Sequence, residues 1–107
     1  MASEWQAYPD LKQHLSALSD PFRLSLLRLL AERRELTVGE LVAALGRSQP
    51  LVSFHLKFLR EAGLVRQRRQ GRQVFYTVDA AQFARLQHLL ESVVLPEGLR
   101  RRVSRVR

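Results

Sequence analysis

Hydrophobic residues recur at helical spacing along the first third of the chain. Leu11, Leu15 and Leu18 form one such stripe. Residues 19–21, Ser-Asp-Pro, supply an N-cap and a first-turn proline for a second helix that runs to about Arg34. The buried side of this helix is expected to hold Phe22, Leu26, Leu27, Leu29 and Leu30, and the outer side Arg23, Arg28, Arg33 and Arg34. We therefore predict a core helix here.

Two short helices joined by a tight turn are predicted next. Thr37 and Glu40 have the spacing of a capping box, in which each side chain bonds a backbone N–H of the first helical turn. Gly46 suits the left-handed position that ends a helix, and Ser48 is a new N-cap two residues later. This arrangement is a helix-turn-helix. The second helix directs Val52, Leu56 and Leu59 inward, and its opposite face holds Gln49, Pro50, Ser53, Phe54, Lys57 and Arg60.

The apolar period changes from helical to two after Gly63. Residues 64–69 and 73–78 predict two strands joined at a turn around residues 70–71. A last helix from about residue 80 follows, with apolar positions Phe83, Leu86, Leu90 and Val93 or Val94. The order of elements predicts a mainly α fold with a small β-hairpin, which is a winged helix-turn-helix (α-α-α-α-β-β-α).

The length of the chain favours one domain. Its 107 residues are 46% hydrophobic, enough for a modest core that a second copy of the chain could complete. We expect a domain over residues 1–95 and a basic tail over residues 96–107. The absence of cysteine excludes disulfides, thiolate zinc sites and thiol-based sensing. The sequence has no signal-peptide pattern and no run of eighteen apolar residues, so we expect a cytoplasmic protein without membrane contact.

Positive charge is concentrated in the second half of the chain. Eighteen Lys and Arg against ten Asp and Glu give a net charge of +8. Residues 47–78 hold seven basic residues and one acid, and the last eleven residues hold five Arg and one Glu. This clustering favours a polyanion as partner, whereas an evenly spread charge would indicate a surface kept for solubility.

Double-stranded DNA is the polyanion that the helix-turn-helix predicts. A recognition helix contacts base edges with its N-terminal residues, and so Gln49 is suited to adenine and Ser53 to either kind of partner. Phe54 could touch a thymine methyl or pack against its own chain, and Lys57 and Arg60 would lie near phosphates. The predicted DNA-binding residues are Ser48, Gln49, Ser53, Phe54, Lys57 and Arg60 on the helix and Arg66, Arg68, Arg69 and Arg72 on the hairpin.

Three stretches, SDPFRLSLLRLLAE, TVGELVAALGRSQPLVSFHLKFLREAGLV and GRQVFYTVD, resemble the ArsR/SmtB family of bacterial repressors. The resemblance covers about residues 11–91. It implies a homodimer paired through the first and last helices, which binds an inverted-repeat operator and releases it when an inducer arrives. The dimer-interface residues expected on this basis are Leu11, Leu15, Phe83, Leu86 and Leu90.

The resemblance also bears on metal binding. Many members use cysteine pairs on the first helix of the helix-turn-helix, but residues 36–40 hold no cysteine. A second class shares zinc between two chains through ligands on the last helix, and here Asp79, His88 and Glu91 are the candidates, with a shorter spacing than the family pattern. No other cofactor is predicted. His55 is expected to be a structural imidazole, and no inducer can be named.

No constellation in the sequence predicts catalysis, because there is no cysteine nucleophile, glycine-rich phosphate loop or paired carboxylate. We therefore do not expect an enzyme. Two alternatives to a sequence-specific repressor stay open. One is a nonspecific architectural DNA-binding protein driven by its arginines, including the tail LRRRVSRVR. The other is a winged-helix protein-interaction module whose basic face docks an acidic partner.

Overall fold

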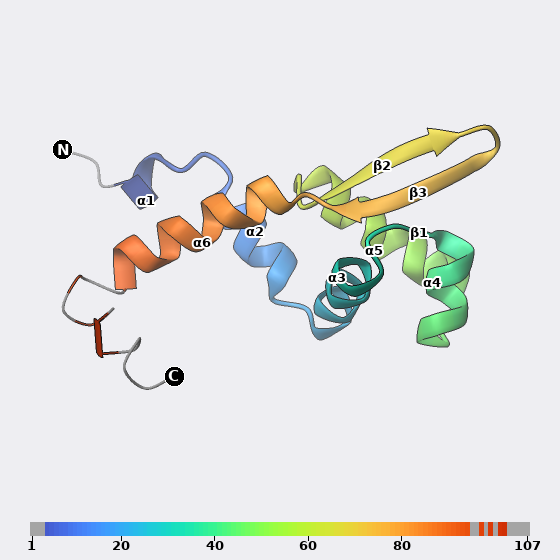
Figure 1. Ribbon diagram of the computed structural model, residues 1–107, viewed down its shortest axis with the longest axis horizontal. Helices are drawn as coiled ribbons and strands as arrows, with labels where there is room; N and C mark the ends of the chain where they lie inside the picture. The colour runs from blue at the N-terminus through green and yellow to red at the C-terminus, as the bar shows by residue number, and fades with distance from the viewer. Residues whose placement is uncertain (1–3, 95–96, 98, 100, 103–107) are drawn as a thin grey trace.

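The fold is that of a winged helix-turn-helix, seen in a computed structural model that describes residues 4–94, 97, 99 and 101–102 (Figure 1). Much of the predicted tail therefore lies outside the described residues. In the described part, no helix is long and apolar enough to cross a membrane. The elements are α1 (Glu4–Ala7), α2 (Leu11–Leu18), α3 (Pro21–Arg33), β1 (Leu36–Thr37), α4 (Val38–Leu45), α5 (Gln49–Glu61), β2 (Val65–Gln70), β3 (Gln73–Val78) and α6 (Ala80–Val94).

The sheet differs from the predicted hairpin in having a third strand. β1 pairs antiparallel with β3, and the strand order is β1-β3-β2. β1 has only two residues, too few to show an alternating pattern, and its second residue, Thr37, is already the N-cap of α4. Its first residue, Leu36, is buried and lies opposite Tyr76. The predicted hairpin of β2 and β3 is confirmed, and the third strand was missed because tertiary pairing, not local pattern, makes β1 a strand. The four-residue α1 was not predicted either.

The predicted helix boundaries are confirmed by their capping contacts. Asp20 accepts hydrogen bonds from the backbone N–H groups of Phe22 and Arg23 at the start of α3. At α4, the Thr37 hydroxyl accepts from the N–H of Glu40 at 3.2 Å, and the Glu40 carboxylate accepts from the N–H of Thr37 at 2.9 Å. This capping box fixes where the first helix of the helix-turn-helix begins.

The turn between α4 and α5 is also as predicted. Gly46 ends α4 in the left-handed region with φ 64°, where a side chain would be strained. The hydroxyl of Ser48 then accepts from the N–H of Leu51 and caps α5. The hairpin turn lies one residue later than predicted, because Gln70 pairs with Gln73 and the loop is residues 71–72. Gly71, with φ 62°, supplies the left-handed conformation there.

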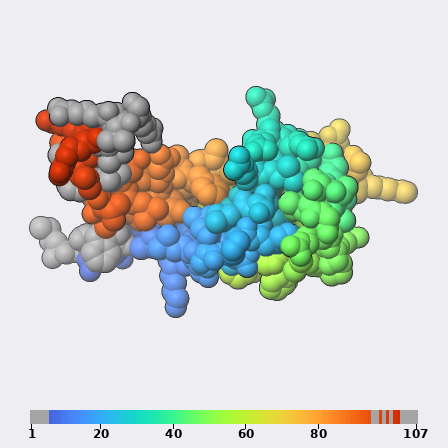
Figure 2. All heavy atoms as spheres, turned by 90° about the horizontal axis from the view of Figure 1, so that it is seen from below, coloured from blue at the N-terminus to red at the C-terminus, as the bar shows by residue number. Residues whose placement is uncertain are grey.

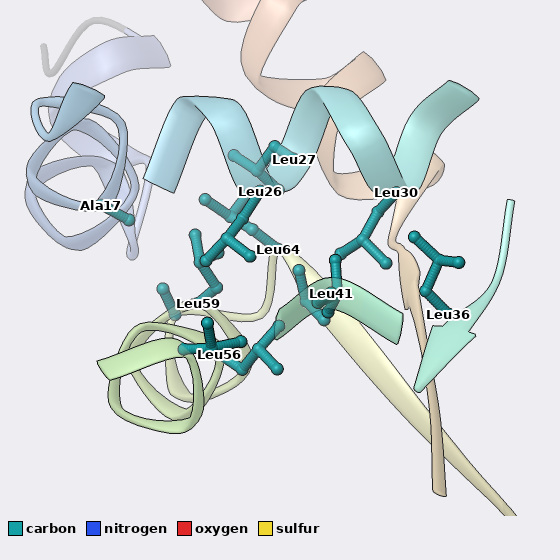
Figure 3. Close-up of a cluster of buried hydrophobic side chains, with 12 residues drawn as sticks. Ala17, Leu26, Leu27, Leu30, Leu36, Leu41, Leu56, Leu59 and Leu64 are labelled. Carbon is teal, nitrogen blue, oxygen red and sulfur yellow. The ribbon is translucent and has the colours of Figure 1, made fainter. Parts of the chain in front are cut away.

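The core lies between α3, α4, α5 and the start of the sheet (Figure 3). Its largest side chains are leucines that have no exposed surface. They come from α3, α4, α5 and the turn after α5, and their packing orients α5 relative to α3 and α4. The fully buried leucines are Leu26, Leu30, Leu41, Leu56, Leu59 and Leu64.

Arg23 does not lie on the outside of α3, as its position on the helix predicted, but is only 8% exposed. Its Nε donates to the carbonyl of Ala17 at 2.8 Å and its Nη2 to the carbonyl of Ser16 at 3.1 Å, both in the last turn of α2. Its Nη1 lies 3.3 Å from Nδ1 of His55 on α5, and its guanidinium lies 4.2 Å from the ring centre of Phe58. A periodicity within α3 cannot reveal this, because the groups that cover Arg23 belong to α2 and α5.

These contacts make Arg23 the junction of three helices. We expect Arg23→Met to lower the free energy of unfolding by about 2–4 kcal/mol, because it leaves the buried carbonyl of Ala17 and Nδ1 of His55 without a donor. Denaturant unfolding followed by circular dichroism measures this loss.

The matched control is Arg28→Met in the same helix. Arg28 is 83% exposed and pairs only with Glu32, so its replacement should change stability by no more than about 0.5 kcal/mol. Equal stability of the two variants would contradict the structural role assigned to Arg23.

Candidate nucleic-acid interface

One face of α5 is exposed, mostly polar and free of acids before its last residue, Glu61. Val52, Leu56 and Leu59 are fully buried on the inner side of the helix. Phe54, on the outer side, is 61% exposed. All the residues predicted for DNA contact on this helix are exposed: Ser48, Gln49, Ser53, Phe54, Lys57 and Arg60. The sequence therefore predicted correctly which side of α5 faces solvent.

The only acid on α5 lies at its far end. Glu61 is the last residue of the helix and lies 3.9 Å from the ammonium group of Lys57. The amino-terminal turn, capped by Ser48, carries no acidic side chain. Because a helix N-terminus attracts anions, this end of α5 favours the approach of a phosphate backbone.

His55 is a buried residue of α5 whose ring contacts Phe54 on the outer face. It is 8% exposed, and its ring lies 4.9 Å from that of Phe22 and 5.2 Å from that of Phe54. Since the guanidinium of Arg23 can only donate, Nδ1 of His55 is the acceptor of this hydrogen bond. The expectation of a structural imidazole is confirmed. Phe54 thus contacts its own chain along one edge and keeps most of its surface exposed.

The wing formed by β2 and β3 extends away from the rest of the molecule (Figure 2, yellow). Its predicted DNA-contact residues are exposed, and they lie in three places. Arg66 and Arg68 share one face of β2, Arg69 lies on the other, and Arg72 is in the loop at the tip. Within residues 4–94, no side-chain hydrogen bond or ion pair engages Arg66, Arg69 or Arg72. These three guanidinium groups are available to a ligand.

Arg68 has a partner within the chain. Its Nε and Nη2 each donate to one carboxylate oxygen of Glu35 at 2.9 Å, its Nη1 donates to Gln70, and its guanidinium lies 4.8 Å from the ring centre of Phe75. The pair spans the sheet from β2 over β3 to the residue before β1. Sequence reasoning missed Glu35, because the partners are 33 positions apart and no local pattern connects them.

The ion pair shifts the pKa values of both of its partners. The hydrogen bond from Arg68 holds the pKa of Glu35 below its usual value, and the same bond raises the pKa of Arg68. Since the folded carboxyl has a depressed pKa, its contribution to stability is present above its ordinary pKa and is lost as the pH falls through the folded value. At neutral pH the pair is therefore intact.

The residues predicted for the dimer interface fall into two groups. Leu15 and Leu90 are 43% and 37% exposed, and Leu11 and Phe83 are partly buried. Leu86 is 2% exposed, so it already packs within its own chain. An apolar hollow of about 340 Å³ along α6 is lined by residues that include Phe83, Leu86 and Leu90.

The candidate zinc ligands do not come together in one chain. Asp79 accepts from the backbone N–H of Gln82 near the start of α6, and Glu91 accepts from the side chain of Gln87. Among the described residues, no group of three or more His, Asp or Glu side chains is placed to hold a metal. A zinc site shared by two chains through Asp79, His88 and Glu91 stays a prediction.

Known proteins resemble both the sequence and the fold. A family model described as "Bacterial regulatory protein, arsR family" matches residues 20–67. The chain is 42% identical over 79 residues to the biofilm growth-associated repressor of Xylella fastidiosa, covering 74% of this chain and 68% of that one. It is 40% identical over 76 residues to the transcriptional activator HlyU of Vibrio cholerae, covering 71% and 69%. The solved ArsR-like regulator from Rhodococcus sp. RHA1 has a TM-score of 0.77 at 27% identity, covering 94% of this chain and 89% of that one.

The matched region of the family model runs from the cap of α3 into β2, and so includes the whole helix-turn-helix. The expectations of a DNA-binding protein and of a protein that is not an enzyme are both confirmed by this family. By sequence and by fold, the chain belongs to the ArsR family of DNA-binding winged helix-turn-helix transcriptional regulators.

Proposed function

We propose that this chain is a sequence-specific repressor that binds, as a homodimer, to an inverted-repeat operator. The observation that carries the proposal is the outer face of α5, where Gln49 and Ser53 are exposed on the amino-terminal half of a helix whose one acid, Glu61, is its last residue. Amide and hydroxyl side chains in that position can make directional hydrogen bonds to base edges. A purely electrostatic DNA-binding protein has no need of them.

The cationic residues on the same surface would contact phosphates. Lys57 and Arg60 lie further along α5, and Arg66, Arg69 and Arg72 extend the positive surface along the wing. Contacts of this kind position a protein on DNA without reading sequence. Arg68 can join them only by exchanging Glu35 for a phosphate.

The similar proteins include a repressor, and this favours repression over activation. They also include an activator of comparable identity. A reporter gene under the chain's own promoter distinguishes the two. Deletion of the protein raises reporter output if it represses and lowers output if it activates.

The experiment that tests sequence specificity is fluorescence anisotropy of a labelled duplex from immediately upstream of the protein's own gene, competed with a scrambled duplex. A specific regulator should prefer the upstream duplex by about a thousandfold or more. A ratio near unity with a steep salt dependence would instead support an architectural DNA-binding protein, and the absence of binding would support a protein-interaction module.

Variants of α5 locate the reading residues in the same assay. Gln49→Ala or Ser53→Ala should remove about 1–3 kcal/mol of discrimination at particular base pairs, while Lys57→Ala should weaken binding to all duplexes alike. Unchanged base preference in both of the first two variants would mean that another surface reads the sequence.

A second prediction concerns the wing. Glu35→Gln should tighten binding to every duplex and steepen the dependence of log K on log salt by about one, because Arg68 is freed for one more phosphate. Arg72→Ala should change the slope by the same amount in the opposite direction. Both slopes are measured by repeating the anisotropy titration over a series of salt concentrations.

The control for Glu35→Gln is Glu32→Gln, which removes the same charge from an exposed pair with Arg28 on α3. If Glu35→Gln weakened binding while Glu32→Gln did not, the pair would hold the wing in position and Arg68 would not be a phosphate contact.

A third prediction concerns the dimer. The wild-type protein should have twice the chain mass of 12.4 kDa in sedimentation equilibrium, and Leu90→Glu should shift it to the monomer because it places a charge in the apolar interface. Leu90 serves better than Leu86, since a charge at the buried Leu86 would unfold the chain.

Leu24→Glu is the matched control, because Leu24 is 48% exposed but lies on α3, outside the expected interface. A Leu90→Glu protein that stays dimeric would place the interface elsewhere.

A further inference from the structure

Helix α6 has a hollow on the side away from the expected dimer interface. Phe83, Leu86 and Leu90 line an apolar hollow on one side of the helix. Arg85, His88 and Leu89 line a different hollow, and at 3.6 residues per turn they fall on the roughly opposite side. A ligand in this second hollow would therefore not compete with a partner chain docked through Phe83, Leu86 and Leu90.

The second hollow lies where α1 and the segment after it meet α6. Helices α1 and α6 lie beside each other in Figure 1. It has a volume of about 360 Å³, within the range of small-molecule sites. Ala7, Tyr8 and Pro9 form one wall, and Arg85, His88 and Leu89 form the other. The hollow thus combines apolar surface with two side chains that can donate hydrogen bonds.

Arg85 is the cation of this site. Its guanidinium lies 5.6 Å from the ring centre of Tyr8, and its Nη1 donates to the side chain of Gln82 at 3.2 Å. Among the side chains of residues 6–94, no carboxylate lies within ion-pair distance of Arg85. An exposed guanidinium with neutral neighbours keeps most of its donors for a planar anion. His88, one turn further along, is a second donor on the same wall.

The Tyr8 wall is anchored to the interior. Its hydroxyl lies 3.0 Å from Nδ1 of His14, a residue of α2 with no exposed surface. The rings meet edge to face at 5.6 Å. The last turn of α2 is in turn held by Arg23, which also bonds His55 on α5. The hollow is therefore built on a helix that contributes to the support of the recognition helix.

We propose that this hollow is a binding site for a small organic carboxylate. The carboxylate would be held by Arg85 and His88, and its apolar body would lie between Tyr8, Pro9 and Leu89. An inorganic anion would leave the apolar walls unused, and a neutral molecule would leave the guanidinium unpaired. The site does not depend on the proposed operator binding, and it can be tested in the absence of DNA.

The test uses benzoate as probe and benzamide as its neutral counterpart of nearly the same shape. Two-dimensional NMR of the full chain should show saturable shifts of the amides of Ala7, Tyr8, Arg85, His88 and Leu89 with benzoate, at a Kd on the order of 1 mM for so small a ligand. Arg85→Gln should weaken benzoate binding at least about tenfold, because it removes the charge-assisted hydrogen bonds. Benzamide should cause no comparable shifts.

The matched control is Arg33→Gln, which removes the same charge from an exposed position on α3 outside the hollow and should leave benzoate binding unchanged. The dispersion of the spectrum reports whether each variant is folded. Three results would overturn the proposal: no saturable shifts with benzoate, equal binding of benzamide, or shifts that gather at the arginines of the wing instead of the hollow. Retained affinity in a folded Arg85→Gln protein would do the same.

Discussion

The rest of the structure depends on one buried guanidinium, that of Arg23. A charge that is only 8% exposed needs partners on all sides, and these come from two other helices: the last-turn carbonyls of α2, and the imidazole of His55 and the ring of Phe58 on α5. The leucine core sets how closely the helices pack, but apolar contacts are non-directional and tolerate small rotations. The hydrogen bonds from Arg23 are directional and do not tolerate such rotations. They therefore fix the rotation of α5 that points Gln49 and Ser53 outward.

The charged residues of the wing also differ in function according to where they lie. Three wing arginines are exposed without a partner in the described part of the chain, while Arg68 is held by a bidentate pair with Glu35. That pair connects the outer strand to the segment before β1 across the face of Phe75. It restrains a hairpin that otherwise extends alone into solvent, at the expense of one cation on the DNA-binding surface. The Arg68–Glu35 pair thus holds the wing in position but leaves one fewer guanidinium free to contact DNA.

Most of the fold could be predicted from the sequence because its signals are local. Capping residues such as Thr37 and Ser48, the left-handed Gly46 and the change of apolar period each act within a few positions, and each was confirmed. The failures share the opposite property. The strand β1, the burial of Arg23 and the engagement of Arg68 by Glu35 all arise from contacts between distant segments. At the site, the periodicity of the sequence predicted the exposed face of α5. It did not predict which arginines are held by a partner and which are free.

The side of the molecule along α6 has room for a small ligand. The interior between α3, α4 and α5 is filled by leucines, and the wing is a thin ribbon of exposed side chains. Three hollows of a few hundred Å³ lie along α6, two of them lined mainly by apolar residues and one with Arg85 and His88 in its wall. The chain has no cysteine, which excludes thiolate ligation of a metal. A chain of contacts connects the proposed site to the recognition helix: the guanidinium of Arg85 lies near the ring of Tyr8, the Tyr8 hydroxyl contacts His14 of α2, and Arg23 joins the last turn of α2 to His55 of α5.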